Sequence, residues 1–217
     1  MGIATSTEAT VERTLFGATD RWKARRVLGR LRFSLLLGAV VLALQLLLAA
    51  PKTHRDAVRS LGINWTSFAS GQIWRLVTDA LIQDRPGLRW SILIPFVWVG
   101  VAEWHLGWRE TAAAYFVTDW LSTVPTLIVL RIASANSTWS AEQISRFDCG
   151  SSAAIYGTLG AFCASRRGPN AWIGPVLLVQ TMTTIWLTNH RLFDVQHLVS
   201  IGVGLVIGLV ASGRRRN

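Results

Sequence analysis

Residues 148–160 read DCGSSAAIYGTLG, at the start of an apolar stretch that is long enough to form a helix. Glycine and alanine recur along it, and such small residues let two helices in a membrane pack with their backbones close together. Two serines open the stretch, although polar groups are costly to place in hydrocarbon. We therefore predict a close-packed membrane helix whose first turn carries a function.

Apolar segments of similar length recur along the chain. Hydrophobic residues make up 51% of the 217 residues, and the mean hydropathy is +0.36. A helix needs about 17–25 apolar residues to cross a hydrocarbon core that is about 30 Å thick. We therefore predict an all-α polytopic membrane protein with six transmembrane helices. The expected spans are about 33–50, 90–106, 111–130, 150–165, 171–188 and 193–212.

The predicted domain organisation has one membrane domain and two tails. Residues 1–32 are a basic N-terminal tail, residues 33–212 the membrane domain, and residues 213–217 a basic C-terminal tail. The longest connection, 51–89, is an outer loop with helical periodicity of its own. An even number of spans places both termini on the same side of the membrane. The basic tails indicate that this side is the cytoplasm. Lysine is rare among the basic residues, which favours a bacterial source and a multi-pass protein of the inner (plasma) membrane.

The formal net charge of +10 raises the question of nucleic-acid binding. Most basic residues lie in the tails and in the predicted inner loops, which is the positive-inside pattern of membrane proteins. We therefore predict no nucleic-acid partner. The charge indicates topology and attraction to anionic membrane lipids.

Two polar residues of the predicted spans should lie at the same depth. Spans four and six both run from outside to inside, and Ser152 and His197 each lie within about one helical turn of the start of their span. Small residues follow on the histidine face of span six, at Ser200, Gly204 and Gly208. We expect these two spans to pack closely, because such small-residue stripes allow close backbone approach.

A serine and a histidine that meet in a sheltered pocket are sufficient for nucleophilic acyl chemistry. The imidazole accepts the proton of the hydroxyl and later returns it to the leaving amine. The pattern Gly-x-Ser-x-x-x-Tyr-x-x-x-Gly, present as Gly150, Ser152, Tyr156 and Gly160, resembles the nucleophile motif of the rhomboid intramembrane serine proteases.

Three further motifs of that family occur on the expected segments. They are the general-base motif of the last span, the Trp-Arg pair of the first outer loop, and the acid followed by Leu-Gly at the end of the second span. They appear here as His197, Ser200 and Gly204; as Trp74 and Arg75; and as Glu103, Leu106 and Gly107.

The resemblance covers about 33–212 and implies a fold, an activity and a site. The implied activity is hydrolysis of a peptide bond in membrane-protein substrates by a Ser152–His197 dyad, without a metal or other cofactor. Transmembrane protein substrates and membrane lipids are the implied partners. The remaining motif residues are expected to support the site or the loop.

The sequence departs from the family pattern at two places. The residue after the nucleophile is Ala153 where glycine is usual, and Ser200 replaces another frequent glycine; both side chains are small. The His and Asn that the family places at the start of span two are absent, and loss of one oxyanion donor typically costs about 10²–10³ in rate. The backbone N–H of Ser152 and the side chain of Gln83 or Ser91 are candidate substitutes.

Two acids lie at the starts of the predicted spans four and six. We expect Asp148 and Asp194 to cap the helix N-termini, where a carboxylate accepts hydrogen bonds from backbone N–H groups. An alternative role for Asp194 is to orient His197.

The two cysteines are not expected to pair within the chain. Cys149 and Cys163 would lie about 21 Å apart along one helix, given a rise of about 1.5 Å per residue. A disulfide requires Cα atoms within about 7 Å. Both are predicted to be packing residues, with Cys149 as a nucleophile the minor alternative.

Two other functions fit parts of the pattern. A catalytically inactive rhomboid-like protein that binds membrane helices would explain the absent oxyanion residues. A proton-coupled carrier would use Asp119, Glu103 and His197 and would not need Ser152.

Overall fold

The computed structural model describes residues 27–87, 90–169, 171–189 and 192–214 of the chain, with backbone alone at a few of them. Throughout these ranges the regular elements are helices, and no strand is formed apart from an isolated antiparallel bridge between Ile63 and Asp148. The first 26 residues of the predicted N-terminal tail and residues 215–217 of the C-terminal tail lie outside the described residues. The all-α prediction is confirmed for the described part of the chain.

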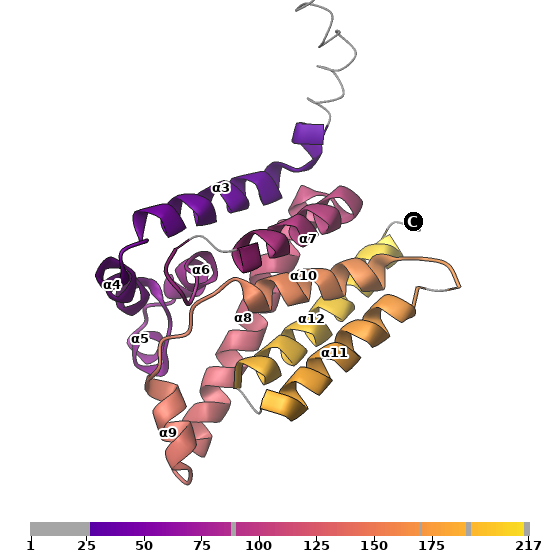
Figure 1. The fold of residues 1–217 in the computed structure, drawn as a ribbon. Coiled ribbons are helices and arrows are strands. Elements are labelled where there is room, and N and C mark those ends of the chain that lie inside the picture. Colours follow the sequence, from indigo (N-terminus) through magenta and orange to yellow (C-terminus); the bar gives the residue numbers. More distant parts are fainter. Residues whose placement is uncertain (1–26, 88–89, 170, 190–191, 215–217) are drawn as a thin grey trace, which may run out of the picture.

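Each of the six apolar segments forms a helix (Figure 1). These helices are α3 (Arg32–Leu47), α7 (Trp90–Leu106), α8 (Trp108–Ala133), α10 (Ser152–Ser165), α11 (Ile173–Asn189) and α12 (Leu192–Arg214). The predicted outer loop 51–89 and the connection between α8 and α10 contain short helices. These are α4 (Pro51–Leu61), α5 (Trp65–Ala69), α6 (Arg75–Thr78), the 3₁₀ helix η1 (Asp79–Leu81) and α9 (Thr138–Ser145).

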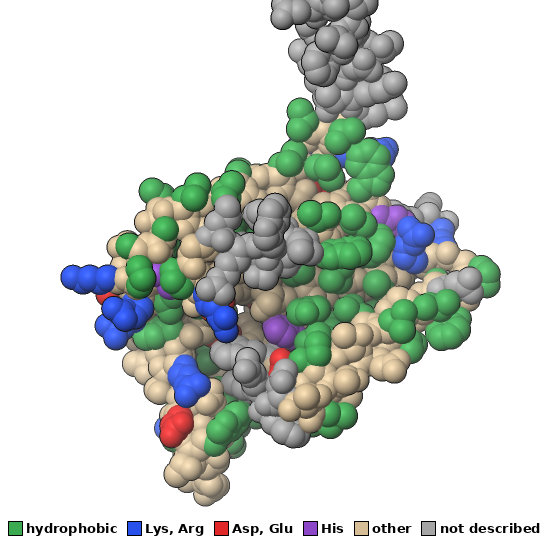
Figure 2. All heavy atoms as spheres, in the orientation of Figure 1, with side chains coloured by type: hydrophobic (Ala, Val, Ile, Leu, Met, Phe, Trp, Pro, Cys, Tyr) green, Lys and Arg blue, Asp and Glu red, His purple; other side chains and the backbone are tan. Residues whose placement is uncertain are grey.

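Two of the described helices are long and apolar enough to cross a membrane, at Trp108–Ala133 and Asp194–Gly213. Arg32–Leu47 and Ile173–Thr188 are apolar but shorter. Large apolar side chains are exposed on α3, α7 and α11, including Leu36, Val97 and Leu177, and Figure 2 shows apolar side chains over much of the visible surface. The arrangement with six spans stays a prediction.

Helix α10 lies at the centre of the bundle, in contact with α12, α8 and α7, and α11 packs against α12 (Figure 1). The helix that packs most extensively against α10 is α12, and glycines make this close approach possible. A Cβ on Gly204 would collide with the carbonyl oxygen of Gly157, and a Cβ on Gly160 would lie 2.7 Å from the carbonyl oxygen of Ile201. The small-residue stripes therefore bring the two backbones into contact, as predicted.

Glu103 joins α7 to the N-terminus of α3. Its buried carboxylate accepts hydrogen bonds from the backbone N–H groups of Phe33 and Ser34, both at 2.8 Å, and from Ser34 Oγ at 2.6 Å. These N–H groups belong to the first turn of α3, which has no acceptor for them inside the helix. Glu103 thus has a structural partner, and Gly107, with φ of 98°, then turns the chain directly into α8.

Arg75 and Trp74 lie in the long loop between α3 and α7. The Arg75 guanidinium donates to the carbonyl oxygens of Arg59 at 2.8 Å and Gly62 at 2.7 Å, where α4 ends. The indole of Trp74 is 51% exposed, and the Arg75 guanidinium lies 5.2 Å from its ring centre. Arg75 therefore binds loop carbonyls, which is the contact expected of a residue that stabilises the loop.

Candidate active site

Ser152 and His197 meet at one end of the bundle. Ser152 is the first residue of α10, its side chain is exposed, and its Oγ lies 2.8 Å from His197 Nε2. His197 Nδ1 is buried and has no partner among the described residues. A neutral imidazole with its proton on Nδ1 presents Nε2 as the acceptor for the serine hydroxyl. The pair thus has the geometry of a nucleophile and its general base.

The parallel packing of α10 and α12 produces this meeting. Contacts advance together along both helices, because Gly157 lies against Gly204 and Ala161 against Gly208. The Ser200 hydroxyl of α12 also donates to the carbonyl oxygen of Ala153 in α10. Two helices in register from their first turns keep side chains at the same depth near each other.

Tyr156 packs on the imidazole of His197. Their ring centres are 4.9 Å apart and the ring planes are inclined by 44°. Tyr156 is one turn after Ser152 on α10, so the same helix supplies both the nucleophile and a wall for the histidine. This contact restricts the orientation of the imidazole.

The chain before α10 is held by the long loop. Ile63 and Asp148 exchange two backbone hydrogen bonds, of 3.0 and 2.6 Å. Gly150 has φ of 132°, a conformation that favours glycine, and its N–H donates to the carbonyl oxygen of Asp79 at 2.9 Å. The loop therefore fixes the position at which α10 begins, and with it the position of Ser152.

Gln83 places an amide beside Ser151, the residue before the nucleophile. Gln83 and Ser151 face each other through Gln83 Nε2 and Ser151 Oγ at 3.0 Å, and through Ser151 Oγ and Gln83 Oε1 at 3.3 Å. The side chain of Gln45, oriented by its partners, accepts from the N–H of Gln83 and donates to the carbonyl oxygens of Arg85 and Gly87. The other candidate donor, Ser91, has a side chain outside the described residues.

The N-terminus of α10 offers backbone donors at the same place. The first helical hydrogen bond runs from the N–H of Ile155 to the carbonyl oxygen of Ser151. The N–H groups of Ser152 and Ala153 consequently have no acceptor within the helix, and the side chain of the N-cap residue Ser151 makes no capping hydrogen bond. The helix dipole adds positive potential here, which suits a developing oxyanion.

The predicted cap by Asp148 is wrong. Its carboxylate instead accepts from Gln196 Nε2 at 3.1 Å, and the same Gln196 nitrogen donates to Thr123 Oγ1 at 2.8 Å. This buried connection joins α12, α8 and the chain that leads into α10. Sequence reasoning missed Gln196, although a glutamine next to His197 in an apolar helix was a usable signal.

Asp194 lies in the first turn of α12 and is buried. One of its carboxylate oxygens has no hydrogen-bond partner in the described part of the structure, and the same is true of His197 Nδ1. The two groups are thus not hydrogen-bonded to each other. The alternative role of Asp194 in orienting His197 is not seen in this geometry.

Buried acids surround the start of α10. Burial raises the pKa of Asp148 to about 6. Burial also raises the pKa of Asp79 well above its ordinary value, and the nearby charges of Asp119 and Asp148 raise it further. The pKa of Cys149 is raised to about 12, first by burial and then by the charges of Asp148, Asp84 and Asp79, so its thiol stays protonated at neutral pH. Cys149 is therefore a poor nucleophile, and both cysteines are free.

The assembled groups can carry out acyl transfer. An exposed hydroxyl, a base in contact with it and donors at a helix N-terminus are the parts that this chemistry requires. Within the described residues, no three His, Cys, Asp or Glu side chains are arranged to hold a metal ion. Comparisons with known protein families, with curated proteins and with solved structures find no match for this chain.

Proposed function

We propose that this chain is an intramembrane serine protease of the rhomboid type, with six spans and both termini in the cytoplasm of a bacterial cell. Its substrates are other membrane proteins, cleaved at a peptide bond near the outer leaflet. The observation that carries the proposal is the 2.8 Å distance between Ser152 Oγ and His197 Nε2. An unactivated hydroxyl is a weak nucleophile, and a base in this position activates it.

The reaction follows from the positions of the two groups. His197 Nε2 accepts the hydroxyl proton while Ser152 Oγ attacks the carbonyl carbon of the scissile peptide. The imidazolium then gives its proton to the leaving amine as the C–N bond breaks, which leaves an acyl ester on Ser152. Water, deprotonated by His197, attacks this ester, and the proton returns to Ser152 Oγ as the acid is released.

Two kinds of donor serve the oxyanion in this proposal. The N–H of Ser152 lies at the N-terminus of α10. The amide of Gln83 is hydrogen-bonded to the hydroxyl of the preceding residue, Ser151. They take the place of the His and Asn that the family carries at the start of span two. Because such donors are already in position before the charge develops, they need no reorganisation during the reaction.

The membrane assignment rests on apolar surface and helix count. The six apolar helices suit a lipid environment, since all but α10 expose Leu, Val or Trp side chains. Basic residues such as Arg166 and Arg167 lie at the end of the bundle away from Ser152, which puts that end inside by the positive-inside rule. Ser152 then lies toward the outer leaflet.

An inactive helix-binding protein is the second candidate, supported by the absence of the family's oxyanion pair. The carrier hypothesis is weakened, because the Glu103 carboxylate that it would use for proton transfer accepts hydrogen bonds from the N-terminus of α3. Only the protease requires a reactive hydroxyl at Ser152.

The decisive test is labelling of purified protein in detergent with a fluorophosphonate probe. We expect wild-type protein to be labelled, and Ser152→Ala and His197→Ala each to lose the label. Since both groups act as one unit, the double variant should be little worse than either single variant. Ser151→Ala and Cys149→Ala are the matched controls and should keep the label.

Folded wild-type protein that stays unlabelled between about pH 6 and 9, a range that deprotonates an ordinary histidine, would favour the inactive protein. Label that depends on Ser151 alone would move the nucleophile by one residue.

A further inference from the structure

A cavity of about 340 Å³ lies at the end of the bundle opposite to Ser152, where α7, α10 and α12 finish. Ligand pockets usually measure about 300–1,000 Å³, so it is large enough to hold a small group. Its polar wall comes from the end of α10 and from the chain that follows. The side chains there are Ser165, Arg166 and Arg167, opposite His105 of α7 and Ser212 of α12.

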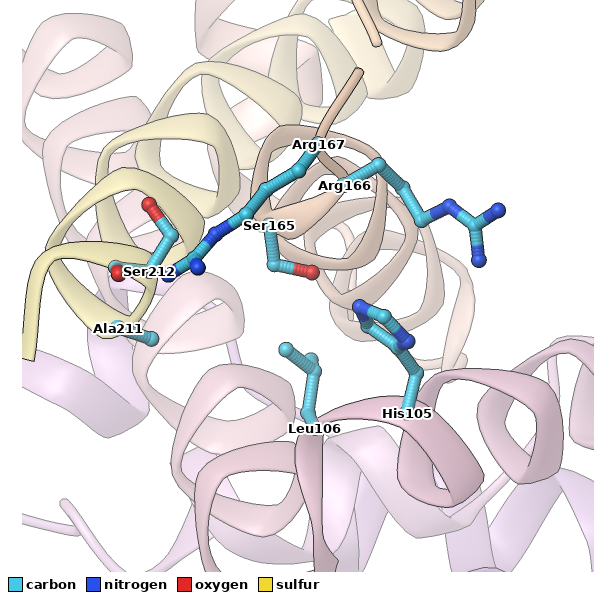
Figure 3. A pocket seen from close by; sticks show the side chains of 7 residues that line it. All are labelled: His105, Leu106, Ser165, Arg166, Arg167, Ala211 and Ser212. Atoms are coloured by element: carbon cyan, nitrogen blue, oxygen red, sulfur yellow. Dashed lines mark hydrogen bonds between the residues drawn. The ribbon is translucent and has the colours of Figure 1, made fainter. Parts of the chain in front are cut away.

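Two guanidinium groups border this cavity on different sides (Figure 3). Arg167 reaches across to α12 and donates to the carbonyl oxygen of Ser212 at 2.7 Å. Arg166 extends the other way, with its guanidinium 5.7 Å from the ring centre of Phe162. Ser165 and His105 lie between the two arms in Figure 3. Both arginines therefore line the cavity, with Arg166 directed away from Arg167.

The two guanidinium groups at this site have no acidic partner among the described residues. Within the described ranges the ion pair between Arg85 and Asp84 is the only one within 4 Å, so neither Arg166 nor Arg167 is paired with a carboxylate. Each guanidinium has five N–H donors, and the bond to Ser212 uses one of them. The hydroxyls of Ser165 and Ser212 donate to carbonyl oxygens of their own helices. These bonds satisfy some of the carbonyl groups that have no partner within the helix at the two C-termini.

A second cavity of about 520 Å³ adjoins the first, and Arg166 and Arg167 line both. Its other walls include Phe162, Ala171 and Gly174, at the start of α11. A charged group held by the arginines would thus have apolar walls next to it. This combination suits an amphiphile better than a free ion.

We infer that the two arginines and the cavity between them bind the phosphate of an anionic phospholipid of the inner leaflet. The inference rests on the membrane orientation of the proposed function and adds a ligand at the end of the bundle away from the reaction. Guanidinium groups match phosphate oxygens with two parallel N–H donors, and basic pockets between membrane helices suit lipid headgroups on the cytoplasmic side. Helix capping by Arg167 alone would explain the bond to Ser212 but not a second cationic arm across the cavity.

The test measures the thermal unfolding midpoint of purified full-length protein in detergent, with added phosphatidylglycerol or with phosphatidylcholine of the same chains. We expect phosphatidylglycerol in large excess to raise the midpoint of the wild type by about 5 °C or more, and phosphatidylcholine to have little effect. The double variant Arg166→Gln/Arg167→Gln should lose this shift. Arg131→Gln/Arg146→Gln, with the same charge change at exposed sites on and after α8, is the matched control and should keep it.

Three results would overturn the inference: a full shift in the Arg166→Gln/Arg167→Gln protein, an equal loss in the control, or an equal shift with phosphatidylcholine. Millimolar sodium phosphate without lipid is a separate arm, and a full shift there would assign the site to free phosphate. If the double variant does not fold, Arg166→Gln carries the test with the same outcomes. Fluorophosphonate labelling of Ser152 is recorded in parallel, so failure of the protease and failure of the lipid site are distinguishable.

Discussion

The helix pairs α10–α12 and α3–α7 both contain glycine, yet they pack in opposite ways. In α10–α12 the backbones touch, with Gly204 against the carbonyl of Gly157. Between α3 and α7 a groove of about 690 Å³ remains, lined by apolar side chains of both helices. A Cβ on Gly38 of α3 would meet nothing within 4 Å.

This difference shows that a glycine brings helices together only when small residues face it from the other helix. Gly157 and Gly204 face each other, whereas the α3–α7 pair is held at one end by the Glu103 carboxylate. The tightly packed pair carries Ser152 and His197, whose chemistry requires fixed distances. The loosely packed pair carries none of the proposed chemistry.

The largest expected effect breaks the tight pair. Gly204→Ala should lower the unfolding midpoint by about 10 °C or prevent folding. The new Cβ would overlap the carbonyl oxygen of Gly157, and overpacking of this kind costs about 1–3 kcal/mol or more. Gly202→Ala on the same helix and Gly38→Ala on α3 are the controls, since no atom lies within 4 Å of either Cβ. Both should be neutral or slightly stabilising, as alanine favours a helix by about 1 kcal/mol. Equal damage from Gly202→Ala would remove the packing explanation.

A smaller effect is expected at Glu103, where hydrogen bonds join α7 to the start of α3. Glu103→Ala removes an acceptor for three hydrogen bonds at the N-terminus of α3 and should cost about 2–3 kcal/mol in the free energy of unfolding. Glu103→Gln keeps one acceptor oxygen and should cost less. Fluorophosphonate labelling of the folded fraction should persist in both, because the tight pair is intact. Loss of labelling at unchanged stability would give Glu103 a part in the reaction.

The smallest effect concerns pH and the chain that leads into α10. The pKa of Asp148 is raised from its ordinary 3.8 to about 6, so the folded state binds its proton more tightly than the unfolded state does. This contribution to stability is fully present below about pH 4 and is lost as the pH rises through about 6. The unfolding midpoint should therefore fall by a few degrees between pH 4 and pH 7. Asp148→Asn should flatten this part of the profile, while Glu142→Gln at an exposed site should not. A midpoint that rises with pH across this range would refute the assignment.

Helix positions were predictable because hydropathy is a local property of the chain. The expected span 150–165 agrees with α10 (Ser152–Ser165), and the expected span 111–130 lies inside α8 (Trp108–Ala133). The ends of α8 were missed because polar residues in its first and last turns, such as Glu110 and Arg131, lower the local hydropathy although they are helical. The short helices of the long loop were expected only as a periodic pattern.

The candidate site divides in the same way. By itself the sequence determined that Ser152 and His197 lie near the starts of two parallel helices with small-residue stripes. Helical rise and spacing follow from the chain alone, and they give the depth and the face of each residue. Only the tertiary structure decided that Asp148 binds Gln196 rather than the helix terminus, and that Gln83 lies beside Ser151. These contacts join residues that are 48 and 68 positions apart. No local pattern specifies such a pairing, since it arises when tertiary packing brings polar groups from distant parts of the chain together away from water.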